Sequence, residues 1–212
     1  MTDQEVAANA ALMFDAGYET TSTFLAFLTH VLVNRQEVQE EIRKEVKDLE
    51  ERDGHLGHNV MHDLPYLDSV VYETLRFFPP VTRFVSRAGS TDYVYKDITI
   101  PAGVDVEVTV QELHHDPDLW KDPQTFDPLR FYGENKSRVN SPAFQAFGAG
   151  PRNCIGMRFA LLEAKLAMAS VLSRFKLIPG PRTEAFDQLE IKYGVITQNP
   201  KKGIFVKVIP LT

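Results

Sequence analysis

A helical spacing of apolar residues over about thirty positions is the feature that most limits how this chain can fold. Thr2 and Glu5 have the spacing of a capping box before the first helical turn. The apolar residues that recur at helical intervals after it are Val6, Ala10, Met13 and Phe14. The pattern predicts a helix over residues 3–33, on the order of 45 Å long and able to cross a whole domain.

The middle of this helix, residues 15–21, departs from the regular pattern. A glycine in a helix interior costs about 1 kcal/mol relative to alanine, and Gly17 is such a residue. Thr20 and Thr21 can donate hydrogen bonds to carbonyls one turn earlier and bend the axis. Taken alone, the segment is typical of a bent core helix with a solvated acid. The alternative is a groove in which a ligand reaches the backbone, with Glu19 and Thr20 offering protons.

Composition narrows the class of protein. The chain has 212 residues, 43% hydrophobic and 25% charged, as in an ordinary globular domain. A formal net charge of −6 argues against nucleic-acid binding. One cysteine, Cys154, excludes an internal disulfide and a multi-cysteine metal cluster. We find no signal peptide and no apolar run that could span a bilayer, so we expect this chain alone to be soluble.

Further elements follow from periodicity and from turn residues. Helices are predicted over 35–52, capped by Asn34, and over 67–78, ended by Pro79 and Pro80. A hairpin is predicted between residues 97–100 and 104–110, and two more strands over 189–196 and 203–209. Glu73 and Arg76 lie side by side on the helix over 67–78. Local sequence leaves open whether they form an exposed pair or a buried one.

The segment 147–156 has the chemistry of a cofactor site and leads into an apolar helix over 157–172. A lone cysteine is most often a small buried residue, but Cys154 precedes a helix whose N-terminus favours negative charge on sulfur. Three glycines around it, Gly148, Gly150 and Gly156, leave room for a large flat ligand. Arg152 offers a cation for a ligand carboxylate. These features suggest a thiolate that binds a planar, anionic metal cofactor, and iron porphyrin meets that description.

Residues 147–156 resemble the haem-binding signature of the cytochrome P-450 superfamily, F-x-x-G-x-R-x-C-x-G. Three other blocks fall in the family's order: the oxygen-activation motif at 16–21, E-x-x-R at 73–76, and the P-E-R-F region at 126–131. The blocks are most similar to animal microsomal members, near the drug-metabolising group and thromboxane synthase. Leu129 departs from the pattern, since the family usually has Glu there, and the resemblance covers only the family's C-terminal half.

The resemblance implies a mainly α fold with small β-sheets, the C-terminal part of the cytochrome P-450 fold. Residues 1–212 would then be a partial catalytic domain, from the long central helix through the cysteine loop to the C-terminal strands. It also implies haem b (iron protoporphyrin IX), with Cys154 as the axial iron ligand and Arg152 paired with a haem propionate. The other implied cofactor-binding residues are Phe147, Gly148, Gly156, Arg87, His114, Ala16 and Gly17.

The resemblance assigns further roles by position. Thr20, with Glu19, would hold water and oxygen for proton delivery, which favours the functional interpretation of the unusual helix segment. Glu73, Arg76 and Arg130 would form a structural salt-bridge triad that holds the cysteine loop in place. The residues implied to line the substrate pocket are Phe14, Val81, Val85 and Val195.

The implied activity is haem-thiolate monooxygenation of a small apolar substrate, with electrons from NADPH through an NADPH-cytochrome reductase. Two alternatives remain: a P-450-type isomerase that needs no reductase, and a truncated non-catalytic fragment. We expect no nucleic-acid partner. The full-length parent would lie on the cytosolic face of the endoplasmic reticulum membrane, attached through an N-terminal anchor that this sequence lacks.

Overall fold

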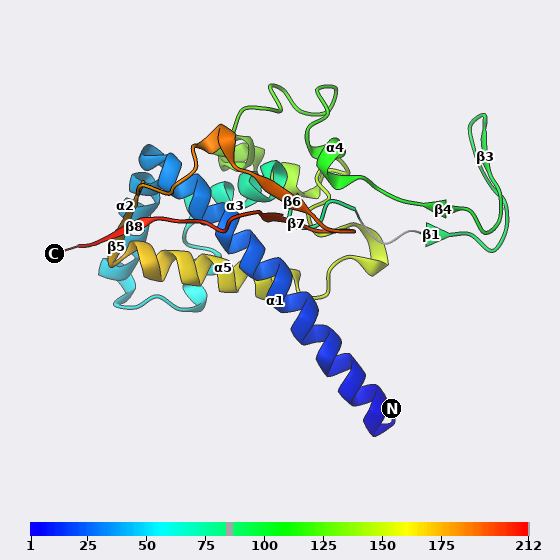
Figure 1. The fold of residues 1–212 in the computed structure, drawn as a ribbon, viewed down its shortest axis with the longest axis horizontal. Helices are drawn as coiled ribbons and strands as arrows, with labels where there is room; N and C mark the ends of the chain where they lie inside the picture. Colours follow the sequence, from blue (N-terminus) through cyan, green and yellow to red (C-terminus); the bar gives the residue numbers. More distant parts are fainter. Residues whose placement is uncertain (84–86, 212) are drawn as a thin grey trace.

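The protein is mainly α-helical, with four two-stranded antiparallel sheets in the part of the chain that the structure describes (Figure 1). This computed structural model describes residues 1–83 and 87–211. The α-helices are α1 (Asp3–Asn34), α2 (Gln36–Asp53), α3 (Pro65–Phe77), α4 (Val110–His114) and α5 (Met157–Leu172). The 3₁₀ helices are η1 (His58–Met61), η2 (Pro128–Phe131), η3 (Gly133–Asn140), η4 (Gly150–Arg152) and η5 (Phe186–Gln188). The fold class expected from the resemblance is confirmed.

Helix α1 has two halves with different surroundings. Its N-terminal capping box is confirmed, since the Glu5 amide donates to Thr2 Oγ1 at 3.3 Å and the Thr2 amide donates to Glu5 Oε2 at 2.7 Å. Residues 1–19 are exposed and extend away from the body of the molecule (Figure 1). From Thr21 onward the helix enters the core, where residues such as Phe27 and Leu28 are fully buried.

The core lies where α1, α2, α3 and α5 pack together. The predicted apolar stripe of α2 is confirmed, because Val38, Ile42, Val46 and Leu49 are all buried. A buried ion pair joins two of these helices: Lys165 Nζ on α5 lies 2.7 Å from Asp68 Oδ1 on α3. The helix that follows the cysteine loop is therefore fixed to the helix that carries Glu73 and Arg76.

Two predicted details of the helix ends are wrong. Asn34 does not cap α2 but ends α1, and its amide nitrogen donates to the carbonyls of His30 and Glu184. Helix α3 begins at Pro65, two residues earlier than predicted, because a side chain from another helix supplies its cap. Glu45 on α2 accepts the backbone N–H groups of Tyr66 and Leu67 at 2.7 and 2.9 Å.

The strands pair differently from the sequence prediction. The pairs are β1 (Arg87–Ala88) with β4 (Asp105–Val106), β2 (Tyr93–Tyr95) with β3 (Ile98–Ile100), β5 (Phe175–Ile178) with β8 (Lys207–Pro210), and β6 (Ile191–Tyr193) with β7 (Gln198–Pro200). The predicted hairpin fails because the chain turns at Lys96, which has a positive φ of 53°, and Val110 begins a helix. The strands predicted over 189–196 and 203–209 are shorter than expected, since β6 covers 191–193 and β8, which pairs with β5, begins at Lys207.

Candidate active site

The cysteine loop is a tight turn held by backbone hydrogen bonds. The Cys154 amide donates to the Phe147 carbonyl at 2.8 Å, and the Asn153 amide donates to the Gly150 carbonyl at 3.1 Å. Gly148 and Gly150 have φ values of 72° and 77°, which a residue with a side chain rarely adopts. The loop therefore needs glycine at both positions, and it leaves Cys154 exposed at the start of α5.

An apolar cleft separates this loop from α1. Its empty volume is about 580 Å³, counting the open space at its mouth. The residues that line it are Thr20, Thr21, Phe24, Leu75, Pro80, Val81, Ala146, Phe147, Cys154, Ala160 and Leu161. Cys154 and Thr20, predicted from segments more than a hundred residues apart, thus face one cavity.

A glycine two residues after the cysteine leaves open space beside the sulfur. A Cβ added at Gly156 would lie 3.9 Å from Cys154 Sγ, in van der Waals contact with the sulfur. A side chain at this position would reduce the space beside the sulfur that a flat ligand needs. The thiol, the apolar lining and the glycines together fit an iron porphyrin, whose faces are apolar and whose iron accepts a thiolate.

The α1 wall of the cleft carries the predicted acid–alcohol pair. Thr20 Oγ1 donates to the Ala16 carbonyl at 2.7 Å, one turn earlier, as predicted for a threonine in this segment. A Cβ added at Gly17 would meet nothing within 4 Å. Glu19 is exposed beside Thr20, and its Oε1 accepts a hydrogen bond from Thr197 Oγ1 at 3.0 Å. The space at residues 16–17 is therefore open in the described part of the chain.

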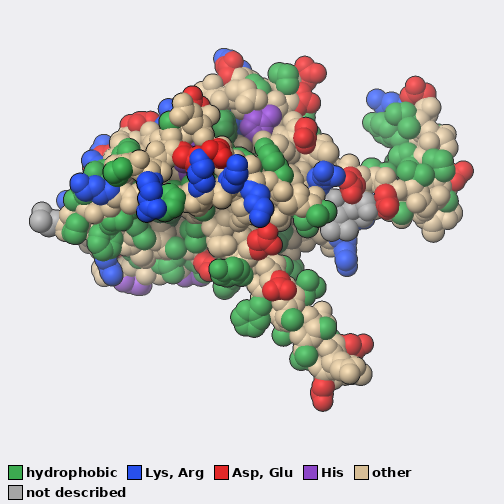
Figure 2. All heavy atoms as spheres, in the orientation of Figure 1, with side chains coloured by type: hydrophobic (Ala, Val, Ile, Leu, Met, Phe, Trp, Pro, Cys, Tyr) green, Lys and Arg blue, Asp and Glu red, His purple; other side chains and the backbone are tan. Residues whose placement is uncertain are grey.

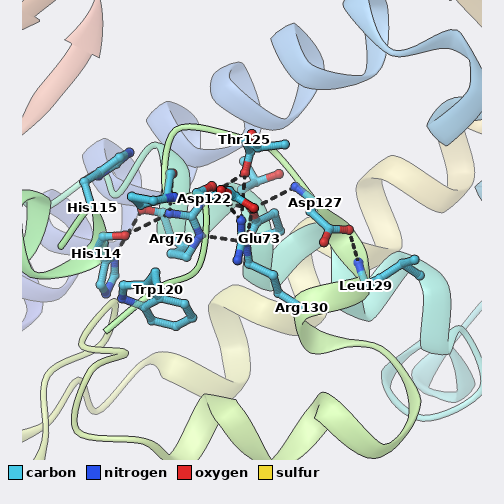
Figure 3. Close-up of polar contacts among 12 residues, drawn as sticks. Glu73, Arg76, His114, His115, Trp120, Asp122, Thr125, Asp127, Leu129 and Arg130 are labelled. Carbon is cyan, nitrogen blue, oxygen red and sulfur yellow. Dashed lines mark hydrogen bonds and ion pairs between the residues drawn. The ribbon is translucent and has the colours of Figure 1, made fainter. Parts of the chain in front are cut away.

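Glu73 and Arg76 form a buried pair, which resolves the alternative that local sequence left open (Figure 3). Both Arg76 Nε and Nη2 donate to the Glu73 carboxylate at 2.8 Å, and both side chains are fully buried. Arg130 Nε lies 3.4 Å from Glu73 Oε1, so the three residues come together. Burial raises the pKa of the Glu73 carboxyl, while Arg76, the Asp127 amide and Arg130 act against that rise.

The arginines of this cluster also donate hydrogen bonds to backbone carbonyls between residues 114 and 125, in the irregular segment that precedes the cysteine loop. Arg76 Nη1 donates to the carbonyls of His114 and Pro123 at 2.8 and 3.0 Å. Arg130 Nη2 donates to the Asp122 carbonyl at 2.8 Å. The cluster thus supplies hydrogen bonds to a stretch with little regular secondary structure, and fixes that stretch to α3.

His114 does not line the cleft, and its role as a propionate partner stays a prediction. His114 is fully buried and stacks on Phe144 with ring centroids 5.2 Å apart. The Gln145 amide donates to its Nε2 at 2.9 Å, so the proton is on Nδ1, which lies 3.1 Å from the Arg76 carbonyl. Both ring nitrogens are therefore engaged within the protein. Burial lowers the pKa of His114 to about 3, so the ring is neutral.

The other predicted residues occupy varied positions. Arg152 is exposed at the end of η4, and Arg87 is exposed in β1, opposite Val106. Val81 lines the cleft, whereas Val85 lies outside the described residues. Phe14 and Val195 are 80% and 87% exposed and do not line the cleft. Their roles toward a propionate or a substrate remain predictions.

Sequence reasoning missed several residues of the site. Among the lining residues, Ala160 and Leu161 follow the cysteine loop by about one helical turn, so helical periodicity after Cys154 could have found them. Pro80 was predicted only as a helix stop, yet it is buried and forms part of the cleft wall. Nothing in the local sequence marks Thr197, because its partner Glu19 lies at the other end of the chain.

The fold and the site together define a class of protein: a mainly helical domain in which one cysteine, on a glycine-rich loop, faces an apolar cleft. Residues 1–206 match the sequence model of the family described as Cytochrome P450. The chain belongs to the cytochrome P450 family.

Three similar proteins illustrate the range of relatives. The chain is 40% identical to thromboxane-A synthase of Rattus norvegicus over 210 residues, which are 99% of this chain and 39% of that protein. It is 41% identical to cytochrome P450 9e2 of Blattella germanica over 179 residues, 82% of this chain and 33% of that protein. It is 37% identical to cytochrome P450 3A29 of Sus scrofa over 210 residues, 99% of this chain and 41% of that protein.

The chain spans about two-fifths of the length of the curated relatives that it matches along its whole length. Within residues 1–83 and 87–211, no helix has both the length and the apolar character that crossing a membrane requires.

Proposed function

We propose that this chain is the haem-thiolate part of a monooxygenase that inserts one atom of O₂ into a small apolar substrate. The observation that carries the proposal is the cleft itself, which Cys154 lines from the loop and Thr20 lines from α1. The lining is apolar apart from these groups and Thr21, as an apolar substrate requires.

Haem b fits the residues on the loop side of this cleft. Cys154 would supply the thiolate ligand, and Phe147, whose carbonyl accepts a hydrogen bond from the Cys154 amide, would pack beside it. Arg152 would bind a propionate, because its guanidinium stays charged and presents paired donors to a carboxylate. When bound, haem supplies the redox chemistry with O₂, which a cysteine thiolate favours by electron donation.

The residues on α1 would handle protons and water. The Thr20 hydroxyl donates its hydrogen bond to the Ala16 carbonyl, so the lone pairs of Oγ1 are left to accept a hydrogen bond from a donor in the cleft. Glu19, exposed beside it, can exchange protons with bulk water. In the overall reaction one oxygen atom enters the substrate, the other leaves as water, and NADPH with one proton supplies the two reducing equivalents.

The redox partner and the location follow from the family. We propose that electrons come from NADPH through an NADPH-cytochrome reductase. The complete protein would lie at the cytosolic face of the endoplasmic reticulum membrane. Both proposals are supported by the similarity to cytochrome P450 3A29.

A second candidate function is isomerase chemistry without a reductase, favoured by the 38–40% identity to three thromboxane-A synthases. The two candidates differ in their need for reducing equivalents. The acid–alcohol pair at Glu19 and Thr20 favours the monooxygenase, because proton delivery is needed only where O₂ is reduced.

Spectroscopy and turnover together test the function. The haem-loaded protein should show, in its reduced carbonyl complex, the strongly red-shifted Soret band of thiolate-bound haem, and Cys154→Ala should abolish that band. Product that appears only with NADPH and reductase supports the monooxygenase. Turnover of a peroxide substrate without NADPH would support the isomerase, and a shifted band retained by Cys154→Ala would refute the site.

A further inference from the structure

The hairpin of β6 and β7 is joined to α1 by two side-chain hydrogen bonds. The two residues that form them lie on one face of the helix, and their two partners lie on one face of the strand segment. Thr197 Oγ1 donates to Glu19 Oε1 at 3.0 Å, and Thr23 Oγ1 donates to Asn199 Oδ1. Glu19 and Thr23 are four residues apart and share one face of the helix. Thr197 and Asn199 are two residues apart and share one face of the strand segment. Figure 1 shows the hairpin lying along α1, and β7 contacts this helix.

The same hairpin forms a backbone pairing with the wall of the cleft. Val81 and Thr197 are antiparallel bridge partners. The Gln198 amide donates to the Pro80 carbonyl at 3.0 Å, and the Thr82 amide donates to the Ile196 carbonyl at 2.9 Å. Because Pro80 and Val81 line the cleft, the position of Thr197 is fixed by the element that forms the cleft wall.

Thr197 therefore connects the cleft wall to the acid beside Thr20. An exposed glutamate has several rotamers, and immobilising it requires a partner whose own position is fixed. The Thr197 hydroxyl is such a partner, because its backbone is held by the bridge to Val81. Its hydroxyl can donate to Glu19 and orient the carboxylate on the α1 face that also carries Thr23.

We propose that Thr197 is a positioning residue for Glu19: it holds the carboxylate of the residue that precedes Thr20 in one orientation and thereby keeps O₂ reduction coupled to substrate oxygenation. This inference rests on the proposed monooxygenase function. A misplaced Glu19 would deliver protons at the wrong time, so NADPH, O₂ and one proton would give hydrogen peroxide and NADP⁺ instead of oxygenated product and water.

The second hydrogen bond supplies the matched control. Thr197→Val and Thr23→Val are equivalent changes, since each replaces a hydroxyl by a methyl group and removes one hydrogen bond between the hairpin and α1. Only Thr197→Val removes a bond to the acid. If the role of Thr197 is purely structural, both variants should change the coupling of NADPH use to product equally. If Thr197 positions Glu19, only Thr197→Val should reduce that coupling.

The experiment measures product, hydrogen peroxide and NADPH consumption in the complete haem-loaded protein with reductase. We expect Thr197→Val to lower kcat for product by about tenfold, part of the ~10²–10⁴-fold that positioned proton transfer contributes, with KM unchanged and peroxide increased. Thr197→Ser, which keeps the hydroxyl, should restore coupling, and Thr23→Val should retain it. Equal uncoupling by Thr197→Val and Thr23→Val, or no rescue by serine, would overturn the proposal.

A second measurement needs no catalysis. In urea unfolding of the same protein, the midpoint shifts of Thr197→Val and Glu19→Ala should be non-additive, because each removes the same hydrogen bond. Thr23→Val and Glu19→Ala remove two different hydrogen bonds and should show a smaller coupling than the Thr197–Glu19 pair. An additive Thr197–Glu19 cycle would overturn the contact, even if oxygenation is observed. A wild-type protein without NADPH-dependent oxygenation would overturn the proposed function, and with it this role of Thr197.

Discussion

The guanidinium of Arg76 forms a two-point hydrogen-bonded ion pair with the carboxylate of Glu73, with both N–O distances 2.8 Å and neither side chain exposed. Because the pair also binds the Asp127 amide and the carbonyls of His114 and Pro123, it joins α3 to the irregular segment that leads to the cysteine loop.

Removal of either partner of this pair should unfold the site. Glu73→Ala and Arg76→Ala each leave a buried charge without its partner, which should lower the free energy of unfolding by about 3–5 kcal/mol and abolish haem binding. Urea unfolding and haem content of the complete protein check this. As a control, Lys47→Ala breaks an exposed pair with Glu51 and should leave both unchanged. Normal haem content with slow turnover would instead mean that the pair is catalytic.

The buried neutral His114 should make stability fall with acid. Its folded-state pKa, lowered by burial to about 3, lies below the ordinary value of 6.5. The unfolded state therefore binds one more proton as pH falls from about 6.5 toward about 3, and the unfolding free energy drops by about 1.4 kcal/mol per pH unit for that proton. The contribution of neutral His114 to the free energy of unfolding is fully present above about pH 6.5, the ordinary pKa of histidine in the unfolded chain.

Comparison with a non-titrating variant isolates this contribution. The unfolding free energy of His114→Gln, measured by urea unfolding at several pH values, should depend less steeply on pH than that of the wild type. Equal slopes for wild type and His114→Gln would contradict a neutral buried His114.

Gly17→Ala should separate helix stability from the function of the groove. A Cβ there meets nothing within 4 Å, and Gly17 lies in the exposed half of α1, so the substitution should increase helicity by far-UV circular dichroism. If the space at residues 16–17 holds water and oxygen, the same variant should uncouple NADPH use from product. Ala11→Gly, at another exposed position of α1, should lower helicity without uncoupling. Full coupling in Gly17→Ala would contradict a functional groove.

Although the sequence alone favours a soluble chain, the apolar side chains that the structure exposes change that expectation: the 212 residues expressed alone should bind haem weakly, aggregate, and show no NADPH-supported oxygenation. Large apolar side chains are exposed along the first half of α1, as Figure 2 shows, and also on the β2–β3 hairpin. Exposed apolar surfaces of this kind promote association between molecules. Haemin titration, light scattering and oxygen consumption with a microsomal reductase check this.

Two variants test the cause of the aggregation. Leu12→Glu and Phe14→Glu, at side chains 61% and 80% exposed, should reduce aggregation without restoring haem affinity. Stoichiometric thiolate-type haem with coupled turnover in the 212-residue chain would contradict the prediction.

The sequence by itself determined the elements whose signals are local. The α1 capping box, the apolar stripe of α2 and the start of α5 depend on residues within about one or two helical turns, so periodicity and capping chemistry predicted them. The same holds for the cysteine loop, whose ten residues include both positive-φ glycines, Gly148 and Gly150. Capping boxes, apolar stripes and positive-φ glycines all depend on interactions between residues close in sequence, so the sequence is enough to predict them.

Tertiary structure decided what depends on partners distant in sequence. Strand pairing between β5 and β8 joins segments about thirty residues apart, and short strands carry no mark of their partner. Whether Glu73 and Arg76 are exposed, whether His114 is charged, and which side chain reaches Glu19 depend on burial and on contacts across the fold. Burial removes water and changes the free energy of each polar group, and only the packed chain determines which groups are buried.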